Sequence, residues 1–187
     1  MTPMMPARSN RTRRAALPTS NETLDVSTAE SSLGLVLVAA TNAGVAAVLI
    51  GDDRAALRGD LARRFPGATF HDGSASAAAL AGRVARAIDT AVDDQAAIPL
   101  DLRGTEFQRA VWRALRAIPR GSTATYAEIA KTIGQPTAAR GVAQACAANP
   151  IAVLVPCHRV VRSDGGLSGY RWGVERKRTL LDREAER

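Results

Sequence analysis

The chain has 187 residues, of which 46% are hydrophobic and 23% charged, enough to bury a core in one domain or two small ones. Its 25 Lys and Arg against 18 Asp and Glu give a formal charge of +7, which suits a polyanionic partner without establishing one. No apolar run reaches the roughly 18 residues that span a bilayer, and residues 1–26 lack the apolar core of a secretory signal, so we expect a cytoplasmic protein without membrane contact.

The cysteine and histidine content is low. Cys146 and Cys157 are too few for a disulfide framework, and His71 and His158 are too few for a common zinc cluster. We therefore expect reduced thiols, no metal site and no cofactor.

Residues 1–30 mix Pro, Ser, Thr, Asn and Arg without the periodicity of a helix or a strand. This composition offers too little apolar surface to offset the entropy lost on ordering, so we expect a disordered arm. Its arginines would either contact phosphates without sequence preference or remain solvated. They are Arg8, Arg11, Arg13 and Arg14.

Residues 31–96 are expected to form an N-terminal α/β domain. Two apolar runs flank Thr41-Asn42-Ala43-Gly44, which predicts a β-hairpin with Asn42 and Gly44 able to adopt positive φ. Apolar residues at helical spacing predict helices over 54–65 and 76–92, packed beside the sheet.

Residues 97–187 are expected to form a mostly helical C-terminal domain, because the Pro-containing segment 94–104 separates them from the β-rich half. Thr105 can cap a helix that ends before Pro119, and Thr125 can cap a helix over 126–133.

A third helix is predicted over 137–148, where almost every side chain is small. Together with the helix over 126–133 and a Gly-containing turn it has the pattern of a helix-turn-helix. Small side chains would let this helix approach a DNA backbone closely. The same composition also suits tight packing against a core, so the helix alone leaves both interpretations open.

The apolar run 151–155, interpreted as a buried strand, leads into Pro156-Cys157-His158-Arg159. A thiol attacks an alkyl carbon only as a thiolate, so Cys157 would need a neighbouring base or positive charge, which His158 and Arg159 can supply. Adjacent strand residues point to opposite faces, so His158 reaches Cys157 only if the chain turns or a water bridges them. Taken alone, Cys-His adjacency more often marks a buried inert cysteine.

The string NPIAVLVPCHRVV, preceded by TYAEIAKTIGQPTAARGVAQACAA and followed by SDGGLSGYRWGVERKRTLLDREAE, resembles the O6-alkylguanine-DNA alkyltransferase family, and in particular the C-terminal module of Ada-type proteins. The resemblance covers about residues 97–186 without a gap. Residues 33–95 are similar to the family's N-terminal domain only in size and element order.

The resemblance implies an α/β fold with a small ribonuclease H-like N-terminal domain and a helical C-terminal domain that contains a winged-helix-like helix-turn-helix. It implies direct-reversal DNA repair, in which a flipped O6-alkylguanine loses its alkyl group to Cys157 in a single turnover, with O4-alkylthymine left open as a second substrate. The implied partner is double-stranded DNA containing the lesion. The protein would bind it as a monomer without an obligate protein partner, and cooperative binding along DNA is left open.

The resemblance also implies roles for single residues. His158 would deprotonate Cys157 through a bound water, and Glu184 would polarise His158. The amide of Asn149 would brace the turn before the active-site strand. Tyr126 would donate a proton toward N3 of the departing guanine.

Arg140 would enter the base stack from the minor groove and replace the extruded nucleotide. The other residues expected to contact DNA are Thr137, Ala138, Gly141 and Gln144. The loop 167–172 would form the pocket wall, and the expected pocket residues are Val160, Ser168, Tyr170 and Arg171. Gly141 departs from the Ala more frequent in the family, which would weaken its helix by up to about 1 kcal/mol.

Two other function classes remain open. A DNA-binding regulator or lesion sensor would use the helix-turn-helix without chemistry, and a mass gain on Cys157 after exposure to alkylated DNA would exclude it. A thiol hydrolase or transferase would use Cys157, His158 and Glu184 on a small molecule, would turn over and would not need DNA. We assign Trp112 to the core and Cys146 to side-chain packing.

Overall fold

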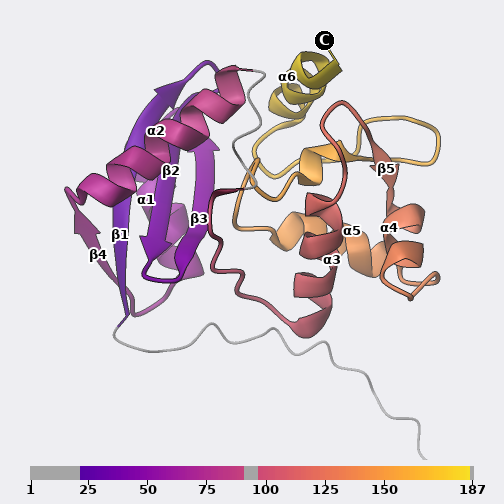
Figure 1. Ribbon diagram of the computed structural model, residues 1–187, viewed down its shortest axis with the longest axis horizontal. Helices are drawn as coiled ribbons and strands as arrows, with labels where there is room; N and C mark the ends of the chain where they lie inside the picture. Colours follow the sequence, from indigo (N-terminus) through magenta and orange to yellow (C-terminus); the bar gives the residue numbers. More distant parts are fainter. Residues whose placement is uncertain (1–21, 91–96, 186–187) are drawn as a thin grey trace, which may run out of the picture.

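The computed structural model describes residues 22–90 and 97–185, which form a mixed α/β fold (Figure 1). The N-terminal half contains β1 (Thr23–Ser31), β2 (Gly34–Thr41), β3 (Gly44–Gly51), α1 (Arg54–Arg64), β4 (Thr69–Asp72) and α2 (Ala75–Asp89). The C-terminal half contains α3 (Glu106–Arg116), β5 (Ala124–Thr125), α4 (Tyr126–Thr132), α5 (Ala139–Ala148), the 3-10 helix η2 (Cys157–Arg159), β6 (Val160–Val161) and α6 (Val174–Ala185). Within these two ranges, none of the helices combines the length and apolarity needed to cross a membrane.

Four strands form the N-terminal sheet in the order β3-β2-β1-β4. Strand β1 pairs antiparallel with β2, and β2 pairs antiparallel with β3, whereas β4 pairs in parallel with β1. A parallel strand needs a crossover connection, which α1 supplies between β3 and β4. Helix α2 packs across β1 and β2, and α1 lies against β3. Strands β5 and β6 form a separate, short parallel pair in the C-terminal half.

The predicted hairpin is confirmed, with Thr41 and Gly44 paired across its turn. Gly44 has a φ of +137°, whereas Asn42 keeps a negative φ. A Cβ on Gly44 would lie 2.4 Å from the carbonyl oxygen of Pro99, so a larger residue would collide with the start of the C-terminal half. Both the backbone conformation and this close contact therefore require glycine at position 44.

The disordered arm expected over residues 1–30 is wrong for its last part, because residues 23–31 form β1. Leu24 and Val26 are buried two positions apart, as on one face of a strand, and β1 pairs with β2 along its length. Most of the other residues of the strand are polar and hide this short alternation. Residues 1–21 of the expected arm lie outside the described residues.

The predicted helices are largely confirmed. Thr105 caps α3 and Thr125 caps α4, each in a capping box. The helix predicted over 76–92 ends at Asp89, and the helix predicted over 137–148 begins at Ala139 without a side-chain cap. The domain boundary predicted near residue 97 adjoins residues 91–96, which lie outside the described residues.

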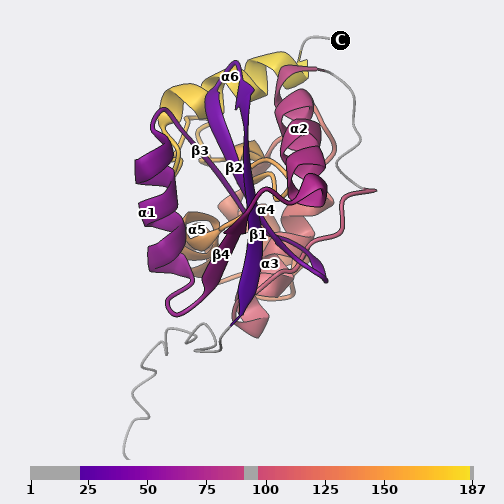
Figure 2. The same cartoon turned by 90° about the vertical axis from the view of Figure 1, so that its left-hand side faces the viewer.

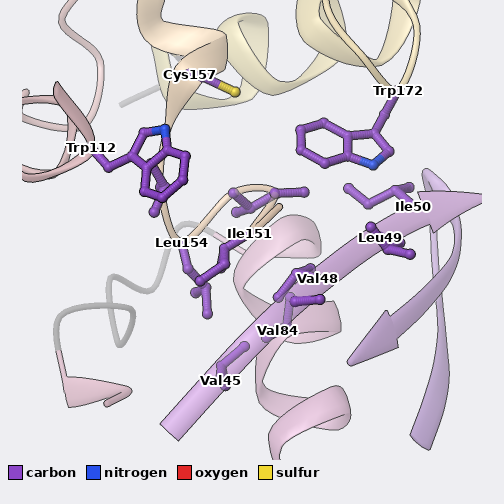
Figure 3. Packing of buried hydrophobic residues seen from close by; sticks show 14 of the residues in the cluster. Val45, Val48, Leu49, Ile50, Val84, Trp112, Ile151, Leu154, Cys157 and Trp172 are labelled. Carbon is purple, nitrogen blue, oxygen red and sulfur yellow. The ribbon is translucent and has the colours of Figure 1, made fainter. Parts of the chain in front are cut away.

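One apolar core runs through both halves. Strand β3 lies at the edge of the sheet and forms single bridges to Leu100 and Ile151. Figure 3 shows Val45 and Val48 of β3 beside Ile151 and Leu154. Figure 2 shows α3, α4 and α5 behind the sheet. The sheet therefore supports the segment that leads to Cys157.

Candidate active site

Cys157 follows a tight turn, so the strand expected over 151–155 is wrong. Ile151 makes one bridge to Val48, and the chain then turns through Val153, whose φ is +66°. This left-handed conformation is rare for a β-branched residue and interrupts any extended run. Cys157 then begins η2. The chain therefore turns at the Cys-His pair, which is one of the two conditions under which His158 could act on its neighbour.

The Asn149 side chain holds this turn together. Its Oδ1 accepts a hydrogen bond from the Ile151 amide at 2.9 Å, and its Nδ2 donates to the Val155 carbonyl at 2.9 Å. Nδ2 also donates to Sγ of Cys157 at 3.2 Å. The residue is fully buried. One amide thus fixes the end of α5, the turn and the sulfur relative to one another.

The Cys157 thiol is only 6% exposed. Burial raises its pKa to about 11, although the Asn149 hydrogen bond and the positive charge of Lys177 act in the opposite direction. At neutral pH the resting side chain is therefore a thiol. Any reaction as a nucleophile requires a base to remove its proton.

His158 and Glu184 are brought together from η2 and α6. His158 Nε2 lies 3.0 Å from Oε1 of Glu184, and both side chains are buried. Arg159 donates to the same carboxylate from Nε at 2.8 Å and from Nη2 at 2.9 Å, and its Nη1 donates to the Ile118 carbonyl at 2.7 Å. The charge of Arg159, expected to act on the thiol, is thus paired with Glu184.

These contacts set the protonation states. Burial lowers the pKa of His158 and outweighs the opposing effect of Glu184, so the imidazole is neutral at pH 7. Burial alone would raise the pKa of Glu184, but hydrogen bonds from His158 and Arg159 hold it at about 2. The ionised carboxylate makes Nε2 the protonated nitrogen. Nδ1 is then an acceptor, and it is buried without a hydrogen-bond partner among the described residues.

Lys177 belongs to this site, and sequence reasoning missed it. It is fully buried, and its Nζ donates to the Val160 carbonyl at 2.5 Å and to the Ser168 hydroxyl at 3.0 Å. The Ser168 oxygen lies 2.5 Å from the Tyr126 hydroxyl. Burial lowers the pKa of Lys177 and raises that of Tyr126. The available signal was the spacing of Lys177, Leu180 and Glu184, which share the buried face of α6.

The expected pocket-wall residues separate into two groups. Tyr170 is buried, with its ring edge-on to His158 at 6.4 Å between centroids, and its hydroxyl has no hydrogen-bond partner among the described residues. Burial raises the pKa of Tyr170 well above the usual value. The side chain of Arg171 instead points to the N-terminal half, where its Nη2 donates to Asp60 on α1 at 3.1 Å.

The residues expected to contact DNA cluster at the start of α5. Arg140, Thr137 and Gln144 are exposed, whereas Ala138 and Gly141 are partly buried. Gly141 faces Phe107 of α3, and a Cβ there would lie 3.1 Å from the phenyl ring. Trp112 donates from Nε1 to the Ala145 carbonyl at 2.9 Å and is a core residue, as predicted.

Within residues 22–90 and 97–185, no group of three or more His, Cys, Asp or Glu side chains is placed to hold a metal ion.

Comparison with known proteins places this site in a family. The crystal structure of Mycobacterium tuberculosis OGT in complex with DNA superposes with a TM-score of 0.69 and 36% sequence identity, over 87% of this chain and 92% of that chain. The chain belongs to the O6-methylguanine-DNA methyltransferase family. Residues 106–186 match the family profile described as 6-O-methylguanine DNA methyltransferase, DNA binding domain.

Curated relatives agree with this membership. The bifunctional transcriptional activator/DNA repair enzyme Ada of Escherichia coli is 49% identical over 161 residues, which are 84% of this chain and 44% of that protein. A methylated-DNA--protein-cysteine methyltransferase of Mycolicibacterium paratuberculosis is 61% identical over 84 residues, 45% of this chain and 51% of that protein. The chain thus spans about half the length of these relatives.

Proposed function

We propose that this protein repairs DNA by transferring the alkyl group of O6-alkylguanine irreversibly to Cys157. The observation that carries the proposal is a buried thiol held by Asn149 beside a neutral His158 that is polarised by Glu184. This arrangement occurs in a chain that belongs to the O6-methylguanine-DNA methyltransferase family. The relatives' names, as a DNA repair enzyme and a methylated-DNA--protein-cysteine methyltransferase, support the same reaction.

The proton of Cys157 would leave through a water bound to His158 Nδ1, the buried acceptor that has no protein partner among the described residues. Glu184 stabilises the imidazolium that forms. The thiolate then attacks the carbon attached to O6, so that an S–C bond forms as the C–O6 bond breaks. A thioether is a poor leaving group, so each molecule acts once.

The departing guanine would take a proton from Tyr126. Ser168 accepts a hydrogen bond from Lys177 and can therefore direct its own hydroxyl proton to the Tyr126 oxygen. The phenol proton is then free to point at N3 of the guanine. The raised pKa of Tyr126 keeps that proton in place until the purine accepts it. These steps leave His158 as an imidazolium and Tyr126 as a phenolate. Return of the His158 proton to Tyr126 through solvent would make both neutral, so that overall one proton moves from the thiol to the guanine.

DNA recognition would use α4 and α5 as the helix-turn-helix of a winged-helix-like domain over residues 97–187. Arg140 would replace the flipped nucleotide, and Thr137, Ala138, Gly141 and Gln144 would contact the backbone beside it. Val160, Ser168, Tyr170 and the backbone at Arg171 would line the base pocket. The N-terminal half, whose sheet begins with β1 at Thr23, would form a ribonuclease H-like domain. We propose double-stranded DNA as the partner of a monomer, with O6-alkylguanine as the lesion and O4-alkylthymine as a second substrate to assay.

The experiment is intact mass with peptide mapping after incubation with a duplex that contains one O6-methylguanine. The expected result is a stoichiometric gain of one methyl group on Cys157 and restored guanine. Binding without a mass gain would indicate a lesion sensor. Neither binding nor a mass gain would favour a small-molecule thiol enzyme.

A further inference from the structure

A cavity lies between the two halves, where α1 faces the loop that follows Tyr170. Its volume is about 410 Å³, within the size range of small-molecule sites. Two apolar residues of the N-terminal half lie opposite cations and an indole of the C-terminal half. The lining residues are Ile50, Leu57, Asp60, Arg171, Trp172 and Arg176.

The cavity wall carries an excess of positive charge. Asp60 accepts hydrogen bonds from Arg64 Nε at 3.2 Å and from Arg171 Nη2 at 3.1 Å, so these two guanidinium groups share one carboxylate, which the exposed Arg63 also contacts at 3.4 Å. Burial and the neighbouring charge of Arg171 both lower the pKa of Arg64, against the effect of Asp60. Arg176 adds a third cation, which has its own carboxylate in Asp52 at 2.6 Å. The cluster can accommodate a further negative charge.

Two buried donors here lack a hydrogen-bond partner among the described residues. They are Nε1 of Trp172 and Nη2 of Arg64, whose Nε donates to Asp60 of the cavity wall. Trp172 is only 6% exposed, and Figure 3 shows its indole nitrogen on the side facing Ile50, another lining residue. Burying a donor without a hydrogen-bond partner is unfavourable. Because both unpaired groups are donors, a ligand rich in acceptors fits this position.

We propose that this cavity binds a small ligand that carries an oxyanion, a phosphate or a carboxylate, on a compact apolar body. The oxyanion accepts from Arg171 and from Trp172 Nε1, since a guanidinium fork matches the geometry of both anions. The apolar body lies on Ile50 and Leu57. Binding of this ligand in the cavity does not require the alkyl-transfer reaction. Its occupant would lie directly behind the active site, because Trp172 packs edge-on against Tyr170 at 5.1 Å between ring centroids.

The test uses the full chain with phenyl phosphate and benzoate as probes and benzyl alcohol as the neutral control. Isothermal titration and thermal unfolding should show saturable binding of an anionic probe with a millimolar Kd and a raised Tm, and no response to benzyl alcohol. Tighter binding of phenyl phosphate would assign the site to phosphates, and tighter binding of benzoate to carboxylates. Absence of saturable binding of either anion up to about 20 mM, some tenfold above a millimolar Kd, would overturn the proposal.

Variants separate this site from general attraction to a basic protein. Arg171→Gln should weaken binding at least tenfold, and Trp172→Phe, which keeps an aromatic ring but removes the N–H donor, should weaken it severalfold. The matched control is Arg63→Gln, because Arg63 also pairs with Asp60 but its side chain is 72% exposed. This control should bind like the wild type. Equal weakening by Arg63→Gln and Arg171→Gln would contradict a defined site.

Discussion

Every buried side chain that the structure describes in the N-terminal half is apolar, whereas five polar or charged side chains are buried in the C-terminal half. These five are Asn149, His158, Arg159, Lys177 and Glu184. Burying such groups costs free energy that hydrophobic residues of the same size would not. The cost is concentrated around one thiol. The N-terminal half therefore supplies stability and support, whereas the C-terminal half contains the destabilising buried polar groups of the site.

Two ion pairs, one from each half, show the same contrast. Arg58 and Asp72 of the N-terminal half form a two-point contact at 2.8 and 2.9 Å on the surface, where a pair contributes little. Arg159 and Glu184 form a similar contact in the interior. Breaking the two pairs should therefore have very different consequences, and the following experiments use this difference.

The largest expected effect is on transfer. Cys157→Ala should abolish the methyl gain while DNA binding remains, because the thiol is the only group assigned to bond formation. The matched control is Cys146→Ala, which removes the other buried thiol and should leave the methyl gain intact. Intact mass and a binding titration with the lesion duplex measure both properties. Loss of binding in Cys157→Ala would contradict this separation of roles.

Glu184→Gln should destabilise the protein by about 3–5 kcal/mol, because it leaves the buried Arg159 without its counter-charge. Urea unfolding measures this change. Asp72→Asn removes the surface counterpart of Arg58 and serves as the control, with an expected loss below about 1 kcal/mol. Similar losses of unfolding free energy in the two variants would show that the buried pair contributes no more to stability than the surface pair.

Leu61→Ala tests whether a change in the N-terminal half lowers stability without affecting transfer. Leu61 is fully buried in α1, so its truncation should cost about 2–5 kcal/mol of unfolding free energy. The transfer rate per folded molecule should not change, because this half supports the site without contributing reacting groups. Urea unfolding and single-turnover kinetics at low temperature test the two statements. A reduced rate in fully folded Leu61→Ala would weaken the division between the halves.

Acid should destabilise the protein through the C-terminal half. His158 and Glu184 both have folded-state pKa values below their ordinary values, so their contributions are present above pH 6.5 and pH 4.5 respectively and are lost below them. Urea midpoints should therefore fall from pH 7 to 5.5 and further toward pH 4. His158→Gln should show a smaller decrease between pH 7 and 5.5. An unchanged decrease in that variant would assign the acid sensitivity to other groups.

The smallest expected effect is at the contact between α3 and α5. Gly141→Ala should stabilise the protein by less than about 1 kcal/mol, because alanine favours a helix and the partly exposed Phe107 can move by a few tenths of an ångström. Thermal unfolding measures the gain. A lower Tm would show that Phe107 is held rigidly against α5.

The sequence predicted those elements of the fold whose signals lie within a few neighbouring residues. The hairpin around Gly44 and the caps at Thr105 and Thr125 were predictable because each depends on residues within a few positions. Strand β1 was not, because its pairing with β2 and β4 compensates for a polar composition. The turn at Val153 was hidden in an apolar run, since the Asn149 hydrogen bonds that hold it depend on the fold.

In the active site too, some residues could be predicted from the sequence and others depend on contacts that only the fold creates. The resemblance suggested Cys157, His158 and Glu184, and the structure places the last two in direct contact. Lys177 stands between two arginines in a helix rich in charged residues, and the composition of this helix gives no reason to bury a lysine. Its burial depends on acceptors at Val160 and Ser168, which only the folded chain brings together.

The raised pKa of Cys157 also protects the thiol in the resting protein. With a pKa of about 11, roughly one molecule in ten thousand carries the thiolate at pH 7, since each unit is a factor of ten. Soluble electrophiles and oxidants attack thiolates and therefore find almost no target. If Cys157 accepts one alkyl group irreversibly, as proposed, its burial preserves the thiol until the substrate arrives.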